Sequence, residues 1–444
     1  MKTTPLAILL MLAACNGKNN DGSDTTDNAD TTDTVDTDTG TPAPAVGVID
    51  VTVASGGAPV IGATVAFHDV DGSVLGTGTT DANGAASFDT FPSGGGVTAA
   101  VADTARILVS ALGLEPNDDV TLDPGFGGTF EVGQADVLVE SAFVGGTNHY
   151  VHYGCGRRTA TPGVALELAL RDNCVSTDNR ATFVATSEDA SGDVVAFEVQ
   201  RNVLIPATST PSVTFDSWRE DLGSFGLSAI NAPANVVDLD VEHFEVDGGI
   251  SVYASSNQSE PLTEGGSATF TFDEVIGELE GVGVLTQLVF DSASNGTISA
   301  RYSTYASVPA TVNTDLSTDL WPRAHESDVD LDAGTVVWTE DSPVTGADVL
   351  LLQLTWEIGT DSYVWVISAP PPSEPEFVVP QLPESLAAWW PTQASEFSRA
   401  PAVIYLDNST VTDWAEVRTA VPPRMLSRPF DYPAPFDLKL LQAL

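Results

Sequence analysis

The chain is short of basic residues, of cysteine and of long apolar runs. Its 444 residues include 16 Lys and Arg against 62 Asp and Glu, which gives a formal net charge of −46. Only three of the basic residues are lysines (Lys2, Lys18 and Lys439). Phosphate binding needs clustered Lys and Arg, so nucleic acid is excluded as an expected partner, and charge-driven docking onto anionic lipid is excluded with it. The acidity fits a solubilising surface, calcium binding or work in salty water.

Motifs that would identify a hydrolase are also missing. The sequence has no Gly-x-Ser-x-Gly elbow and no His-Glu-x-x-His. Only five histidines are present, and the nearest to a metal pair are His149 and His152, which would point to opposite faces of a strand. Acidic residues are too numerous for a glycosidase pair to be chosen among them. No catalytic residue is therefore assigned, and no cofactor beyond structural calcium is expected.

The N-terminus has the features of an export signal. Met1 and Lys2 precede an apolar run over 6–12 that is too short to span a bilayer as a helix. The following Leu12-Ala13-Ala14-Cys15 resembles the lipobox of bacterial lipoproteins. That resemblance implies a signal peptide at 1–14 and a mature protein that begins at Cys15 with acyl chains such as palmitate. Asn16 after the cysteine resembles the signal for the outer membrane.

An acidic segment follows the lipobox. From Asp21 to Asp36, aspartate recurs at every third position, with threonine in most of the gaps. Such a segment has nothing to bury, and its like charges repel one another. We therefore expect residues 15–45 to form a disordered tether between the anchor and the folded part of the chain.

Turn signals and alternating residues predict a first small sandwich over 46–123. Ile49, Val51 and Val53 alternate with polar residues, as in a half-buried strand, and turns recur about every ten residues. The motifs Gly57-x-Pro59-Val60-x-Gly62-Ala63, Asp71-Gly72, Thr80-Asp81-x-x-Gly84 and Phe91-Pro92-Ser93-Gly94 resemble the carboxypeptidase regulatory-like domain. This resemblance implies a seven-stranded transthyretin-like (prealbumin-like) sandwich that serves as a spacer or docking module.

The rest of the chain continues as β structure, with strand-like runs separated by Gly, Asn, Asp and Ser. The expected fold class is all-β, with tandem antiparallel sandwiches of Ig-like or prealbumin-like type. We expect a β-rich domain at 124–260, a second at 261–370 and a Pro-rich C-terminal segment at 371–444. Without Cys15, the remaining Cys155 and Cys174 are expected to form a disulfide in an oxidising compartment.

Two groups of residues are candidates for binding. Asp69 and Asp71 in Asp69-x-Asp71-Gly72 could supply oxygen ligands to calcium, although hairpin turns favour the same residues. Seven of the eight tryptophans lie at or after Trp321, and the adjacent Trp389 and Trp390 could stack on a sugar or peptide. Trp356 lies in the same period-two register as Leu352 and Leu354, and Trp365 in that of Tyr363 and Ile367. Both tryptophans are therefore expected in the core.

These features favour a lipid-anchored surface protein that acts as a non-catalytic binding, adhesion or structural module. Its expected partners are the membrane, through the acyl anchor, and a surface glycan or protein ligand. A glycan or peptide hydrolase and a periplasmic assembly factor remain as alternatives.

Overall fold

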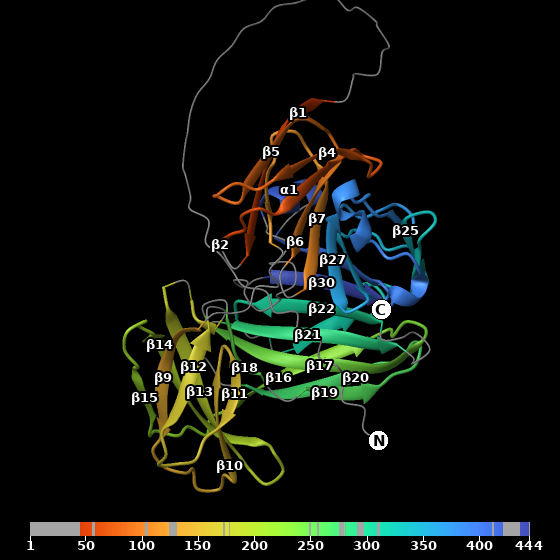
Figure 1. Cartoon of the computed structure of the whole chain (residues 1–444). Helices are drawn as coiled ribbons and strands as arrows, with labels where there is room; N and C mark the ends of the chain where they lie inside the picture. Colours follow the sequence, from red (N-terminus) through yellow and green to blue (C-terminus); the bar gives the residue numbers. More distant parts are fainter. Residues whose placement is uncertain are drawn as a thin grey trace, which may run out of the picture.

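The computed structural model describes residues 45–443, apart from short gaps. The gaps are 56–57, 103–104, 124–130, 172–173, 177, 248–249, 255–256, 275–278, 280, 291–296, 308, 310, 411–412 and 421–435. Cys15 and the acidic segment up to residue 44 lie outside the described part. The described residues form almost only strands, which make four layered sandwiches (Figure 1). The expected all-β class with tandem sandwiches is confirmed.

The first sandwich covers residues 46–122. One layer holds β1 (Val46–Ser55), β2 (Ala58–Pro59), β5 (Ala85–Pro92) and β8 (Asp119–Leu122), and the other holds β3 (Thr64–His68), β4 (Val74–Thr79), β6 (Gly95–Ala102) and β7 (Arg106–Leu114). The alternating Ile49, Val51 and Val53 of β1 are buried, as predicted. Gly72 lies in the turn between β3 and β4, and Gly84 lies in the turn between β4 and β5. Their φ values of +80° and +76° are readily adopted by glycine, which explains why glycine occupies these positions.

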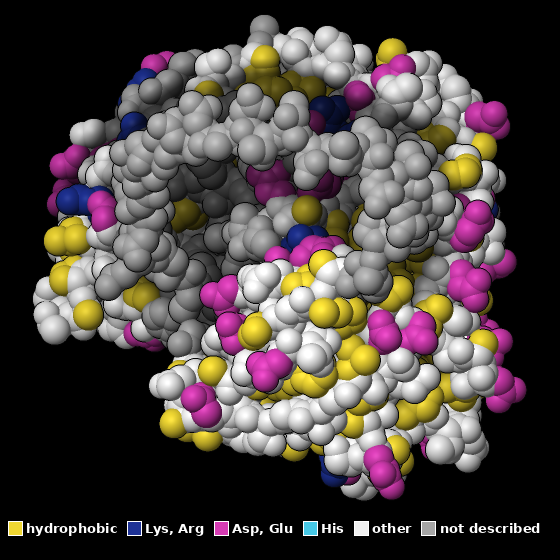
Figure 2. Space-filling model, turned by 90° about the horizontal axis from the view of Figure 1, so that it is seen from above, with side chains coloured by type: hydrophobic (Ala, Val, Ile, Leu, Met, Phe, Trp, Pro, Cys, Tyr) yellow, Lys and Arg dark blue, Asp and Glu magenta, His cyan; other side chains and the backbone are white. Residues whose placement is uncertain are grey.

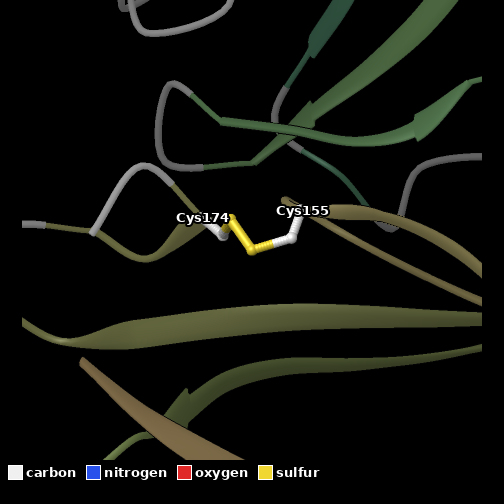
Figure 3. The surroundings of a disulfide bond; sticks show 2 residues. All are labelled: Cys155 and Cys174. Carbon is white, nitrogen blue, oxygen red and sulfur yellow. A yellow bond between two sulfur atoms is a disulfide. The ribbon is translucent and has the colours of Figure 1, made fainter. Parts of the chain in front are cut away.

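The second sandwich contains the disulfide. Its layers are β9 (Glu131–Val139), β12 (Leu166–Arg171) and β15 (Ser212–Phe215) against β10 (Asn148–Tyr153), β11 (Gly156–Thr159), β13 (Arg180–Glu188) and β14 (Val194–Leu204). Cys155 and Cys174 are bonded, with Cα atoms 5.0 Å apart (Figure 3), which confirms the predicted pair. The bond ties the β10–β11 turn to the segment between β12 and β13.

Replacing Cys155 and Cys174 together by alanine is expected to lower the free energy of unfolding of the second sandwich by about 3 kcal/mol. The reason is that the bond closes a loop with a sequence separation of 19, which restricts the unfolded chain. Urea unfolding followed by circular dichroism would measure the loss. The wild-type protein in excess reductant is the control and should lose a similar amount; a stability unchanged by both treatments would contradict the expectation.

The third sandwich follows directly. Its layers are β16 (Gly223–Ile230), β20 (Ala268–Glu274) and β23 (Thr311–Asp315) against β17 (Val236–Asp247), β18 (Ile250–Ala254), β19 (Gln258–Pro261), β21 (Gly281–Phe290) and β22 (Ile298–Tyr305). Its core includes Phe225, Leu239 and Phe272. Since strands on both sides of residue 260 share this core, the structural division differs from the predicted boundary at 260/261, which falls inside β19.

The fourth sandwich is built largely from the C-terminal part of the chain. Its layers are β24 (Ala324–Asp330), β25 (Thr335–Glu340) and β28 (Glu376–Val378) against β26 (Val349–Ile358), β27 (Asp361–Ala369), β29 (Ala402–Asn408) and β30 (Phe436–Ala443). The short helices are η3 (Glu384–Trp389), η4 (Ala394–Glu396) and α1 (Trp414–Ala420). Three of these strands come from the predicted Pro-rich segment 371–444, which therefore shares one core with 324–370.

One 13-stranded sheet runs through the first, third and fourth sandwiches (Figure 1). On one side of the fourth sandwich, β30 pairs antiparallel with β22 from Ile298↔Gln442 to Thr304↔Phe436. On the other side, β27 pairs parallel with β7 from Tyr363↔Arg106 to Ser368↔Ala111. Backbone hydrogen bonds thus join these three sandwiches into one framework.

Charged side chains reinforce two of the joints. At the β22–β30 pair, the Arg301 guanidinium donates hydrogen bonds to Asp437 Oδ1 at 2.9 Å and to Asp437 Oδ2 at 2.5 Å. Between the second and third sandwiches, Asp247 accepts a hydrogen bond of 2.5 Å from the Thr182 hydroxyl and pairs with Arg201. Asp247 is only 7 % exposed, whereas the Arg201 side chain is 35 % exposed, so solvent still screens one side of this ion pair.

No helix in the described ranges is both long and apolar enough to cross a membrane.

Candidate functional site

The predicted aromatic platform is an aromatic cluster in the core of the fourth sandwich. Trp356 and Trp365 are fully buried, which confirms their expected place in the core. Trp356 stacks on Tyr363 with ring centroids 5.5 Å apart and an interplanar angle of 6°. The Trp356 indole donates a 2.8 Å hydrogen bond to the carbonyl oxygen of Trp389. This bond fixes the end of η3 against the sheet.

Trp389 and Trp390, the candidate ligand-binding pair, are half-buried against this cluster. The Trp390 ring packs edge-on against Trp356 and Trp365, at centroid distances of 6.0 and 5.8 Å. The Trp389 ring lies edge-on to Tyr363 at 5.9 Å. The chain leaves the 3₁₀ helix in an extended conformation at Trp390, so two adjacent rings can both reach the core. Their partly exposed surface is what remains for a ligand.

Arg106 extends the aromatic cluster to the first sandwich. Its guanidinium carbon lies 5.4 Å from the Tyr363 ring centroid and 5.5 Å from that of Trp389, and it donates a 2.6 Å hydrogen bond to Asp361. The ion pair is partly exposed, so its own contribution is small. Arg106 is the single Lys or Arg between residues 46 and 123, and this isolation was the one signal in the sequence.

Beneath this surface, a buried hydrogen-bonded chain crosses from the first sandwich to the fourth. His68 Nε2 lies 2.8 Å from Thr98 Oγ1, and Thr98 Oγ1 lies 2.7 Å from Ser110 Oγ. The Trp365 indole then donates to Ser110 Oγ at 2.7 Å. Burial lowers the pKa of His68 to about 4, so its imidazole is neutral at pH 7. These hydrogen bonds satisfy buried polar groups where the first and fourth sandwiches meet. The sequence patterns did not indicate them.

The candidate calcium ligands Asp69 and Asp71 belong to the turn between β3 and β4. Asp69 Oδ1 accepts the Val70 N–H at 2.8 Å, and Asp71 Oδ1 accepts the Ser73 N–H at 2.9 Å. Hydrogen bonds from Ser73 hold the pKa of Asp71 below its usual range. These carboxylates already stabilise the turn, and a calcium role for them stays a prediction. Across the described ranges, no three His, Cys, Asp or Glu side chains gather as they would around a metal ion.

His149 and His152 lie on β10 and have separate partners. His149 Nε2 accepts the Phe143 N–H at 3.0 Å, while His152 Nε2 lies 2.9 Å from the Thr186 hydroxyl. Burial is the main reason that the pKa of His152 is lowered to about 3. Both residues therefore fit packing positions in the second sandwich.

Comparisons with known proteins add little. No family model and no curated protein matches the chain. Among solved structures, the Bacillus anthracis TIE protein covers 61% of this chain at 10% identity with a TM-score of 0.15, and this chain spans half (50%) of that protein. The overlay with the major pilin subunit of Bacillus cereus covers 61% of this chain and 99% of the pilin chain, at 10% identity and a TM-score of 0.14. At such TM-scores these overlays carry no functional argument.

Proposed function

We propose that this chain is a lipid-anchored, non-catalytic module of the cell envelope that holds a rigid binding surface away from the membrane. The observation that carries the proposal is the 13-stranded sheet through the first, third and fourth sandwiches. Paired strands resist bending far better than flexible linkers, so the framework suits a structural or adhesive role. Cys15 would carry the acyl anchor, and the acidic segment would act as the tether.

We further propose that the first sandwich is a carboxypeptidase regulatory-like domain. The support is local: glycines of the matching motifs, Gly62, Gly72, Gly84 and Gly94, all have φ between +76° and +80° at turns. Seven longer strands and the two-residue β2 make two facing layers. In this role the domain would be a spacer or docking unit next to the tether.

Changing Cys15→Ser is expected to release the protein from membranes into the soluble fraction. One acyl chain gives only marginal binding and several chains give stable anchoring, so loss of the acylated residue removes the anchor. Flotation of cell membranes on a density gradient would measure it. A Cys155→Ala, Cys174→Ala variant is the matched control and should still float.

Continued flotation of the Cys15→Ser variant would contradict the anchor. Protease treatment of intact cells then distinguishes the two orientations. Loss of residues 46–444 would support a surface module, and protection until the outer membrane is opened would move the module to the periplasm.

A further inference from the structure

The edge of the 13-stranded sheet at β4 is open. In the described part of the chain, β4 pairs with β3 alone, from Thr64↔Thr79 to His68↔Val74. An edge strand presents a row of backbone N–H and C=O groups that another extended chain can pair with. The opposite end of this sheet differs, because β18 contacts β10 and β13 of the second sandwich.

The sequence of β4 itself also does not protect this edge against strand addition. Charged residues, proline or a very short strand normally discourage pairing at an edge. β4 reads Val-Leu-Gly-Thr-Gly-Thr, and it is the longest described edge strand with neither a charged residue nor a proline. By contrast, β11 carries Arg157 and Arg158 at its edge, and β12 carries Glu167 and Arg171. The exposed Leu75 adds an apolar side chain to the β4 surface.

A groove of about 500 Å³ runs along this edge. One wall is Val74–Thr77 of β4, and the other is the segment Gln381–Ser385 of the fourth sandwich. The Gln381 N–H donates a 2.9 Å hydrogen bond to the Gly72 carbonyl oxygen, which holds the second wall beside the start of β4. At about 3.3 Å per residue, the four β4 residues offer roughly 13 Å of strand.

The charged residues around the groove indicate which kind of molecule would bind there. Glu384 is exposed in its wall, and the exposed Asp71 lies in the turn that leads into β4. None of the described lining residues is Lys or Arg. A second copy of this chain, with 62 acidic and 16 basic residues, would bring further negative charge to a groove whose described lining holds one acidic residue and no basic one. A basic segment would instead gain from complementary charge. Figure 2 shows the same imbalance on one face of the molecule, where acidic side chains far outnumber Lys and Arg.

We propose that the β4 groove binds an extended peptide rich in Lys or Arg, which adds to β4 as a further strand. Backbone hydrogen bonds to β4 supply affinity, and alternate basic side chains face Glu384 and Asp71. Peptide binding in the β4 groove does not require the acyl anchor. The experiment on the groove can therefore fail or succeed independently of the proposed cellular location.

Binding can be tested with the full chain and three fluorescent eleven-residue peptides. One alternates valine with lysine, one alternates valine with glutamate, and one is the lysine peptide with proline in place of valine. The lysine peptide is expected to bind at least tenfold more tightly than the other two in fluorescence anisotropy. Hydrogen–deuterium exchange is expected to slow at least fivefold at the amides of Val74–Thr79. Equal binding of all three peptides, or protection only elsewhere, would overturn the proposal.

Two charge reversals make the test specific to the groove. Glu384→Lys is expected to weaken binding of the lysine peptide at least threefold. Glu357→Lys changes the net charge equally at an exposed position of β26 outside the groove lining, and it should leave the affinity unchanged. Equal weakening by both variants would overturn the site. So would a dimer of the peptide-free chain that already protects β4, because the occupant would then be a second copy.

Discussion

Deleting residues 436–444, which contain β30, is expected to unfold the fourth sandwich and detach the third from it. This strand has seven register pairs with β22 and six with β29. Leu438 and Leu441 are at most 3 % exposed, and loss of one buried leucine side chain alone costs about 2–5 kcal/mol. The summed loss approaches the total stability of a domain, about 5–15 kcal/mol. Circular dichroism melting with limited proteolysis would detect the loss.

The chain offers two internal comparisons for this deletion. None of the described strands of the second sandwich belongs to the 13-stranded sheet, so the melting transition of this sandwich should remain. Lys439→Gln changes a partly exposed side chain of β30, whose contact with Asp407 is 3.7 Å, and should shift stability by less than about 1 kcal/mol. A deletion variant that melts like the wild type would show that β30 does not connect the sandwiches.

Trp365→Ala is expected to reduce the free energy of unfolding by about 3–5 kcal/mol, the usual cost of removing a large buried aromatic side chain. Trp365 is fully buried, touches Trp390 and donates its indole hydrogen bond to Ser110 of β7. The substitution leaves a cavity between the first and fourth sandwiches and removes one of the two hydrogen bonds of the Ser110 hydroxyl, which keeps its contact with Thr98. Denaturant unfolding of the full chain would measure the change.

Trp218→Ala is the matched control for this substitution. Trp218 is partly buried in the second sandwich, where it contacts Phe143 and His149. We expect its loss to cost less than half as much. If Trp365→Ala were no more destabilising than Trp218→Ala, the packing at the β7–β27 joint would be contradicted. Trp365→Phe with Ser110→Ala, in a double-mutant cycle, would isolate the hydrogen bond from the lost volume.

Local features of the fold could be predicted from the sequence, because they depend on neighbours in the chain. Alternation at Ile49, Val51 and Val53 predicted a half-buried strand, and two cysteines in an exported chain predicted a disulfide. Trp356 was expected in the core from its spacing with Leu352 and Leu354. For these strand residues, the period of two decides which side chains face inward, whereas the disulfide follows from the number of cysteines and the compartment.

The joints between sandwiches could not be predicted in this way. The β7–β27 and β22–β30 pairs connect segments that are more than a hundred residues apart, and no local pattern encodes such partners. The predicted boundaries at 260/261 and 370/371 rest on local patterns alone. In the structure, one core groups residues 225–320, and another groups residues 321–443 with Ala100 and Leu108.

The arrangement of the candidate site could likewise be predicted only in part from local sequence patterns. In a regular strand, adjacent side chains point to opposite faces, so two neighbouring tryptophans cannot easily both be buried. At Trp389 and Trp390 the end of η3 breaks the alternation, and each ring is half-buried against a different partner. Whether the remaining exposed ring surface binds a glycan stays a prediction.

The parallel pairing of β7 with β27 also determines how long β7 must wait for its partner strand during synthesis. Ser110 and its partner Trp365 are 255 residues apart, and ribosomes add about 5–20 residues per second, so roughly 13–51 s pass between their synthesis. During that time one edge of β7 has no partner, and the buried face that holds Leu108 has no cover from the fourth sandwich. The nascent first sandwich is therefore most exposed to wrong strand pairing before its distant partner has been made.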